Sequence, residues 1–186
     1  MEKIQSTGRL LDYKDFRKYS DTLIETGSGH GGGIQRALDA GFRSIVSIEA
    51  KPENYEICME RFLPDPRIVL LLGESVNVLP EVLDIFRQRV VFFLDAHPSG
   101  PRSYGHKELM EGNRDFAQDT IIRKELGILL ESPYKHVFIL DDINGHAIAS
   151  DYVQMIADKR ENYKFFFYDE NPGTFYKDKL LVAVPE

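Results

Sequence analysis

Cysteine is nearly absent from this sequence, since Cys58 is the only one among 186 residues. A single cysteine excludes a disulfide framework within the chain and any metal cluster built on several cysteines. Long apolar runs are absent too: Ile68–Leu72 and Val90–Leu94 are far shorter than the roughly 20 residues of a transmembrane helix. The N-terminal MEKIQSTGRLLDYKDF has no apolar core or cleavage site typical of a secretion signal. We therefore expect a cytoplasmic protein with no membrane partner.

Runs of lysine and arginine are also missing, and the formal net charge is −7. Because an acidic molecule repels polyanions, we expect no nucleic-acid partner. No internal repeat or low-complexity tract is visible. The length, with 42% hydrophobic and 28% charged residues, predicts one globular domain over residues 1–186, and a homo-oligomer remains possible.

Short β-branched and aromatic runs alternate with amphipathic segments along the chain. The first five runs are nearly continuous in apolar residues, which is typical of strands buried on both faces, and the alternation predicts βαβ units in a parallel sheet. The expected strands are Thr22–Thr26, Ser44–Glu49, Arg67–Leu72, Val90–Asp95, His136–Asp141, Lys164–Tyr168 and Leu180–Val184. The expected helices are Gly33–Ala40, Pro52–Phe62, Val76–Gln88, Thr120–Glu131 and Ser150–Glu161.

The last two expected strands are joined only by DENPGTFYKDK, which is too short for the crossover that parallel strands need. They must pair as an antiparallel hairpin, with Asn171-Pro172-Gly173 supplying the turn. Five parallel strands followed by a terminal hairpin resemble the class I methyltransferases, from the first strand to the last. This resemblance implies an α/β, Rossmann-like three-layer sandwich whose mostly parallel, seven-stranded sheet has the order 3-2-1-4-5-7-6.

One connection is unusually long, because residues 98–118 separate the fourth expected strand from its helix. Ordered loops of this length are uncommon and are usually lids, binding loops or disordered segments. The segment begins at the carboxyl edge of the sheet, where open α/β folds bind ligands. We interpret 98–118 as a substrate lid, with a plain surface insertion as the alternative.

The strongest local signal is the glycine-rich stretch 27–33, which follows a strand and opens a helix. Such a loop lets a ligand approach the backbone and presents free N–H groups to an anion. That anion is the carboxylate of S-adenosylmethionine or the pyrophosphate of a dinucleotide, because Gly27, Gly29 and Gly32 also satisfy G-x-G-x-x-G. Glu25 completes an acid-x-G-x-G-x-G pattern that resembles the first methyltransferase motif. The residues that this resemblance implies for S-adenosylmethionine binding are Glu25, Gly27, Ser28, Gly29 and Gly31.

Two later strand ends extend the expected cofactor site. Glu49, followed by Ala50, ends the second strand, where an acid accepts hydrogen bonds from ribose hydroxyls in both methyltransferases and dinucleotide-binding enzymes. The alternative for Glu49 is a cap on the following helix. Gly73-Glu74-Ser75 resembles the third methyltransferase motif, which implies contact of Glu74 or its neighbouring backbone with adenine. Ser75 is equally suited to cap the next helix.

Acidic residues follow the fourth and fifth expected strands. Asp95, Asp141 and Asp142 should meet at one edge of the sheet, where a cation would offset their repulsion. Oxygen ligands suit Mg²⁺, with Ca²⁺ or Mn²⁺ as rivals. The arrangement resembles the metal-dependent O-methyltransferases of the macrocin and catechol types, which implies a metal held by these three aspartates. The alternatives are helix caps, or binding of the methionine amine by Asp95.

The residues expected to act in catalysis are Asp95 and His97. An imidazole of ordinary pKa suits a general base near neutral pH, although a histidine that only orders the loop is the alternative. Asp95-Ala96-His97-Pro98 also lacks the Asn/Asp-Pro-Pro-aromatic signature of DNA amino-methylating enzymes. We therefore predict an S-adenosylmethionine-dependent methyltransferase that acts on an oxygen of a small molecule or sugar, with a divalent metal as a candidate second cofactor. An NAD-dependent oxidoreductase and a non-catalytic S-adenosylmethionine-binding module are the alternative hypotheses.

Overall fold

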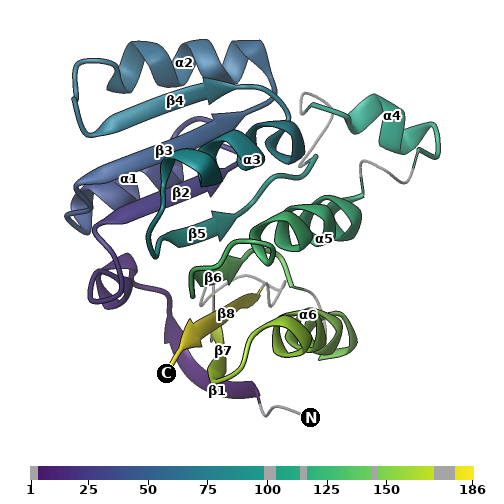
Figure 1. Ribbon diagram of the computed structural model, residues 1–186. Coiled ribbons are helices and arrows are strands. Elements are labelled where there is room, and N and C mark those ends of the chain that lie inside the picture. The colour runs from purple at the N-terminus through teal and green to yellow at the C-terminus, as the bar shows by residue number, and fades with distance from the viewer. Residues whose placement is uncertain (1–3, 99–103, 114–116, 144–145, 170–178) are drawn as a thin grey trace.

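The computed structural model describes residues 4–98, 104–113, 117–143, 146–169 and 179–186. Helices cover both faces of a single twisted sheet (Figure 1). The strands are β1 (Ile4–Leu10), β2 (Thr22–Thr26), β3 (Ser44–Glu49), β4 (Ile68–Leu72), β5 (Val91–Leu94), β6 (Val137–Leu140), β7 (Tyr163–Asp169) and β8 (Lys179–Pro185). The helices are η1 (Tyr13–Phe16), α1 (Gly32–Asp39), α2 (Pro52–Phe62), α3 (Ser75–Ile85), α4 (His106–Met110), α5 (Gln118–Leu129) and α6 (His146–Lys159).

The sheet has eight strands in the order β1-β7-β8-β6-β5-β2-β3-β4. Read from β4, the seven expected strands follow the predicted order, and β8 pairs antiparallel with both β6 and β7. The α/β Rossmann-like class and the terminal hairpin are therefore confirmed. The turn at Asn171-Pro172-Gly173 lies outside the described residues.

The eighth strand, β1, was not predicted. It pairs parallel with β7 at one edge of the sheet, and its register shifts between Ser6 and Leu10. Most of its side chains are exposed, and the segment IQSTGRL has no continuous apolar run. An edge strand of this composition lacks the pattern by which buried strands are recognised.

Two apolar layers enclose the sheet, and the alternation of β5 shows how they are divided. Phe92 and Leu94 face the layer covered by α3, α5 and α6, while Val91 and Phe93 face the layer covered by η1, α1 and α2. All four of these side chains are buried. Successive residues of a strand point to opposite faces, so a continuous apolar run is what a doubly covered sheet requires.

The parallel strands β2 to β6 all end at one edge of the sheet, which brings distant parts of the chain together. Helix α4 belongs to the long connection 98–118 and lies beyond this edge (Figure 1). The lid interpretation of 98–118 stays a prediction, and residues 99–103 and 114–116 of it lie outside the described residues. None of the helices in the described part of the chain combines the length and apolarity needed to cross a membrane.

Candidate cofactor and catalytic site

A cavity of about 480 Å³ opens at the carboxyl edge of the sheet, between the ends of β2 to β5 and helix α5. Its volume lies in the range of small-molecule sites, roughly 300–1,000 Å³. The lining residues are Gly27, Gly29, Ile48, Glu49, Ala50, Asn54, Gly73, Glu74, Ser75, Val76, Asp95, Ala96, His97, Pro98, Tyr104, Asn113, Ile121 and Lys124. Most of the predicted cofactor residues therefore surround one space.

The first two glycines of the loop have different roles. Gly27 has a φ of +83°, and a Cβ there would lie 2.5 Å from the carbonyl oxygen of Asp95. Its N–H donates to the Ile48 carbonyl at 2.8 Å. Gly29 also has a positive φ, of +51°, but no atom of the described residues lies within 4 Å of its Cβ position. Gly27 thus lets three strand ends pack closely, and Gly29 leaves backbone open to the cavity.

The side chains of Glu25, before the loop, and Ser28, within it, are buried and do not line the cavity. The Ser47 hydroxyl donates its one hydrogen to Glu25 at 2.5 Å. In the 2.6 Å bond between Ser28 and Ser47, the Ser28 hydroxyl is therefore the donor. Burial raises the pKa of Glu25 to about 8, against the lowering effect of the Ser47 hydrogen bond. Gly31, with a φ of +82°, packs against the Phe62 ring. These contacts hold the loop on its buried side, and a direct contact of Glu25, Ser28 or Gly31 with a cofactor stays a prediction.

Glu49 holds the loop from the cavity side. Its carboxylate accepts the Gly29 N–H and the Lys51 N–H, each at 2.8 Å, and the side chain is buried. A carboxylate offers about four lone-pair sites, so roughly two stay available to hydroxyl donors of a ligand. The position therefore suits the predicted ribose contact.

The third motif lies on the neighbouring wall. Ser75 is the first residue of α3 and lines the cavity beside Glu74, whose side chain forms no cap hydrogen bond. Glu74 accepts hydrogen bonds from Tyr104 at 2.6 Å and from Asn77 at 3.2 Å. Tyr104 belongs to the connection 98–118, so this segment contacts the wall that is expected to bind adenine.

The catalytic candidates form an ionic cluster. The His97 Nε2 lies 3.0 Å from an Asp142 carboxylate oxygen and 3.3 Å from one of Asp95. Burial lowers the pKa of His97, but the hydrogen bonds and charges of Asp142 and Asp95 outweigh it and raise the pKa to about 10. The ring is therefore protonated at neutral pH and does not have the ordinary pKa on which its general-base role was based. A catalytic role for His97 stays a prediction.

The metal prediction is not supported by this arrangement. Among the described residues, no group of three or more carboxylate, histidine or cysteine side chains could hold a metal ion. The imidazolium of His97 lies between Asp95 and Asp142 and supplies the positive charge that a cation was expected to provide. Asp141 is buried and accepts the Asp142 N–H at 2.8 Å. The sequence predicted that Asp95, Asp141 and Asp142 lie at one edge of the sheet. It did not show that His97 would neutralise two of them, Asp95 and Asp142.

Replacing Asp142 with asparagine should lower the pKa of His97 by about 1 or more, since a carboxylate within hydrogen-bond distance stabilises the charged ring. Ring-nitrogen chemical shifts, followed by NMR from about pH 6 to about pH 11.5, measure this change. His136 is an internal control, because burial lowers its pKa to about 4 at the opposite end of β6. Equal His97 titration curves in the variant and the native protein would contradict the ion pair.

One notable acidic side chain near the site was missed. Glu125 of α5 is fully buried, and neither of its carboxyl oxygens has a hydrogen-bond partner among the described residues. Burial raises its pKa to about 8, against the opposing effect of the nearby Ser75 and Thr26 hydroxyls, and the charge of Asp95 acts in the same direction as burial. A neutral carboxyl group therefore lies just behind the wall formed by Ser75 and Asp95.

Other lining residues that the sequence did not identify are Asn54, Asn113 and Lys124. Each is a common polar residue in a helix or loop, and no motif marks it. Tyr104 lies within residues 98–118, which the sequence predicts as a lid without marking any of its side chains. Lys124 of α5 and Asn113 of the connection 98–118 reach the cavity because of how these segments pack on the sheet, which no local sequence pattern predicts.

No protein-family model matches the chain, and no curated protein matches it in sequence. Solved structures do share its fold. An rRNA methylase from Streptococcus thermophilus is 10% identical, with a TM-score of 0.55 and coverage of 92% of this chain and 93% of that one. A protein from Streptococcus mutans, described as a methyltransferase candidate in complex with SAH, is 13% identical, with the same TM-score and coverage.

A third similar structure is the 23S rRNA methyltransferase ErmE, which is 15% identical with a TM-score of 0.55. The match covers 96% of this chain and 70% of that one. At such low identity these likenesses establish the class I methyltransferase fold and leave the activity to be inferred from the site.

Proposed function

We propose that this chain is an S-adenosylmethionine-dependent methyltransferase. The observation that carries the proposal is the convergence of Gly27, Glu49, Ser75 and Asp95 on one cavity at the carboxyl edge of the sheet. These four positions come from four different strand ends or helix starts, and the same cavity has the size of a small-molecule site. The fold shared with structures named as methyltransferases, one of them in complex with SAH, supports the same proposal.

Each part of the cofactor has a candidate partner in this cavity. The glycine loop at Gly27 and Gly29 lines the part of the cavity that suits the methionine tail, and the Asp95 carboxylate suits the methionine amine. The remaining lone pairs of Glu49 suit the ribose hydroxyls, and Glu74 and Ser75 lie on the wall that suits adenine. The residues present therefore fit the cofactor.

S-adenosylmethionine supplies an activated methyl group, and in the transfer the carbon–sulfur bond breaks with its electron pair left on sulfur. The chain must align the acceptor and, for a hydroxyl acceptor, receive its proton. Of the predicted catalytic groups, Asp95 presents a carboxylate to the cavity, whereas His97 first has to release its own proton. Asp95 and His97 also line the cavity beside the glycine loop.

A hydroxyl of a small molecule or sugar is the acceptor that we propose. The net charge of −7 and polar lining residues such as His97 and Asn113 favour a small acceptor over a polyanion. RNA is the second candidate, because two of the structures with this fold are named as rRNA methylating enzymes. Transfer of labelled methyl groups to a panel of small hydroxyl compounds and, separately, to total RNA distinguishes the two.

Isothermal titration calorimetry with S-adenosylhomocysteine and with NAD tests the proposal. Binding of S-adenosylhomocysteine without NAD binding supports it, and the reverse supports the oxidoreductase alternative. Cofactor binding without label transfer to any acceptor supports a non-catalytic module. Parallel titrations with Mg²⁺, Mn²⁺ and Ca²⁺ test metal assistance, which a lack of binding would remove.

Glu49→Ala should weaken S-adenosylhomocysteine binding by about 10- to 100-fold, since hydrogen bonds to a charged group contribute about 1.5–3 kcal/mol. The variant also loses the acceptor that holds the Gly29 and Lys51 N–H groups. Calorimetry at constant pH measures the dissociation constant. Glu53→Ala is the matched control, because Glu53 is exposed in the first turn of α2 and does not line the cavity. Equal affinities of the two variants would count against the ribose contact.

A further inference from the structure

The two edges of the sheet are protected to different degrees. The β1 edge contains Ser6, Thr7, Gly8 and Arg9, with a shift of register, and such features discourage pairing with another strand. The β4 edge, Ile68–Leu72, is entirely aliphatic and, among the strands of the described residues, pairs only with β3. It has no charge, proline or irregular pairing within the strand. Its outer backbone groups therefore offer a regular template for a further strand.

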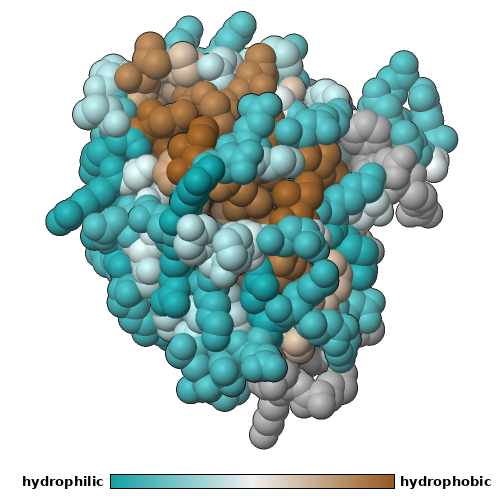
Figure 2. All heavy atoms as spheres, in the orientation of Figure 1, coloured by the Kyte–Doolittle hydropathy of each residue, from teal (hydrophilic) through white to brown (hydrophobic). Residues whose placement is uncertain are grey.

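The side chains at this edge are exposed on both faces of the sheet. Val69 is 49% exposed and Leu72 is 50% exposed, and the two point to opposite faces because they lie three residues apart in a strand. Figure 2 shows apolar surface gathered over the part of the molecule where Figure 1 places β4 and α2. Exposed apolar surface next to an unpaired edge is typical of an interaction site.

Helix α2 extends this surface beyond the strand. Arg61 of α2 donates to the His30 carbonyl and to Gln35 of α1, so this flank of α2 faces α1. The opposite flank carries Tyr55, Met59 and Leu63, spaced four residues apart, and Leu63 is 66% exposed. An apolar row thus runs along the outward flank of α2, beside the exposed Glu56 and Glu60, although a helix flank beside solvent is normally polar.

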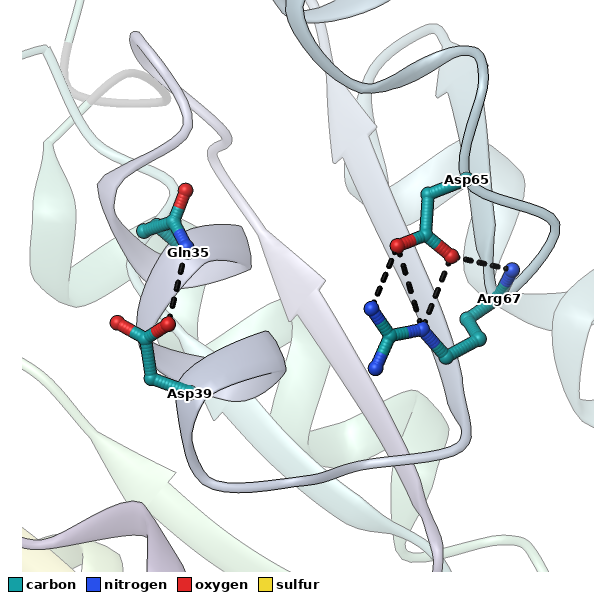
Figure 3. A network of polar contacts seen from close by, with 4 residues as sticks. All are labelled: Gln35, Asp39, Asp65 and Arg67. Carbon is teal, nitrogen blue, oxygen red and sulfur yellow. Dashed lines mark hydrogen bonds and ion pairs between the residues drawn. The ribbon is translucent and has the colours of Figure 1, made fainter.

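The charges before β4 are neutralised within their own turn. Asp65 accepts hydrogen bonds from the Arg67 guanidinium at 2.6 Å and 2.9 Å and from the Arg67 backbone N–H at 3.0 Å (Figure 3). Figure 3 also shows Gln35 donating to Asp39, on α1 and away from this edge. No unpaired charge of the Asp65–Arg67 turn therefore opposes the approach of an identical edge.

We propose that β4 pairs antiparallel with β4 of a second copy of this chain, which joins the two sheets into one. Around a twofold axis at Leu70, Ile68 meets Leu72 and Val69 meets Leu71, so every cross-strand pair is aliphatic. The same axis brings the Tyr55–Leu63 flanks of the two α2 helices together. A second copy fits better than an unrelated strand because its edge carries the same row of aliphatic side chains and the same internally paired charges.

Sedimentation velocity of the full chain tests the proposal. The native protein should have twice the mass of one chain, and Val69→Lys or Leu63→Lys should halve that mass. Leu10→Lys is the matched control, since Leu10 is 46% exposed in the opposite edge strand and its replacement should leave the dimer intact. Circular dichroism and thermal unfolding show that each variant is folded, without reference to the proposed activity.

A disulfide across the axis provides a second test. Leu70→Cys should form a covalent dimer on mild oxidation, whereas Leu10→Cys should not, and the single native cysteine, Cys58, is buried. A native chain with the mass of one copy at every concentration overturns the proposal. So does a dimer that persists in Val69→Lys, or one in which Leu70→Cys cross-links no better than Leu10→Cys.

Discussion

Gly33→Ala is expected to lower the free energy of unfolding by about 3 kcal/mol or more, because overpacking a closed site forces several groups to move. A Cβ at Gly33 would overlap the carboxyl group of Glu25. Glu25 is buried at the end of β2 and accepts the Ser47 hydroxyl, so it has little room to yield. Displacing Glu25 would also disturb Ser28 in the loop above it. Urea unfolding measures the change, and calorimetry measures the accompanying loss of S-adenosylhomocysteine binding.

The neighbouring glycine is the control for this result. Gly32 is exposed at the start of α1, and nothing lies within 4 Å of its Cβ position. Alanine in a helix is favoured over glycine by about 0.5–1 kcal/mol, so Gly32→Ala should be neutral or slightly stabilising. Similar stabilities of the two variants would mean that Gly33 does not pack on Glu25. Two adjacent glycines in one motif thus have different physical reasons for being glycine.

The fold was predictable because its strands are buried on both faces. Runs such as VFFL in β5 have no solvent-facing position, which is typical of a strand in a sheet covered on both faces. The short connection before β8 predicted the hairpin, and the strand order came from the resemblance to class I methyltransferases. The failure was β1, whose polar edge sequence carries no such constraint and whose pairing with β7 depends on residues about 160 positions away.

The position of the cofactor site was predictable, but which of its side chains line the cavity and which are buried behind it was not. A motif shows that Glu25, Ser28 and Glu49 lie near one loop, because the ends of adjacent parallel strands meet at one edge. It does not show which carboxyl group faces the cavity. That difference arises from position along the strands: Glu25 is level with Ser47 and is enclosed by Gly33, while Glu49 lies two residues beyond Ser47, at the end of β3 and at the cavity. Burial of this kind is a property of the packed structure.

The catalytic end shows a second limit. Asp95 and Asp142 were expected to be neighbours, and they are, but their shared partner is His97. Whether a cation or an imidazolium offsets two acids depends on side-chain placement, which spacing does not specify. For Glu125 a signal did exist, because Ile122, Leu126 and Leu129 place it on the buried stripe of α5. A carboxylate on an apolar stripe indicates either a buried neutral acid or a missing partner.

Glu125→Gln is expected to stabilise the protein increasingly as the pH rises. The pKa of Glu125 is raised from 4.5 to about 8 by burial, so the folded protein keeps a proton that the unfolded chain releases. Folding stability from this group is complete below pH 4.5 and is lost as the pH rises through about 8, by about 1.4 kcal/mol per pH unit. Glutamine cannot ionise, so the variant avoids this loss. Urea unfolding at intervals from pH 5 to pH 8.5 measures the difference.

The comparison of variant with native protein isolates Glu125, because the pH dependence of Glu25, His97 and His136 is common to both proteins and cancels. Glu81→Gln is the matched control, since Glu81 is exposed on α3 and its replacement should give a small difference that does not grow with pH. A constant difference between Glu125→Gln and the native protein would show that Glu125 is ionised or solvated in the folded state. In that case the wall behind Ser75 and Asp95 is not the dry, neutral surface that the structure indicates, and a water or cation must reach it.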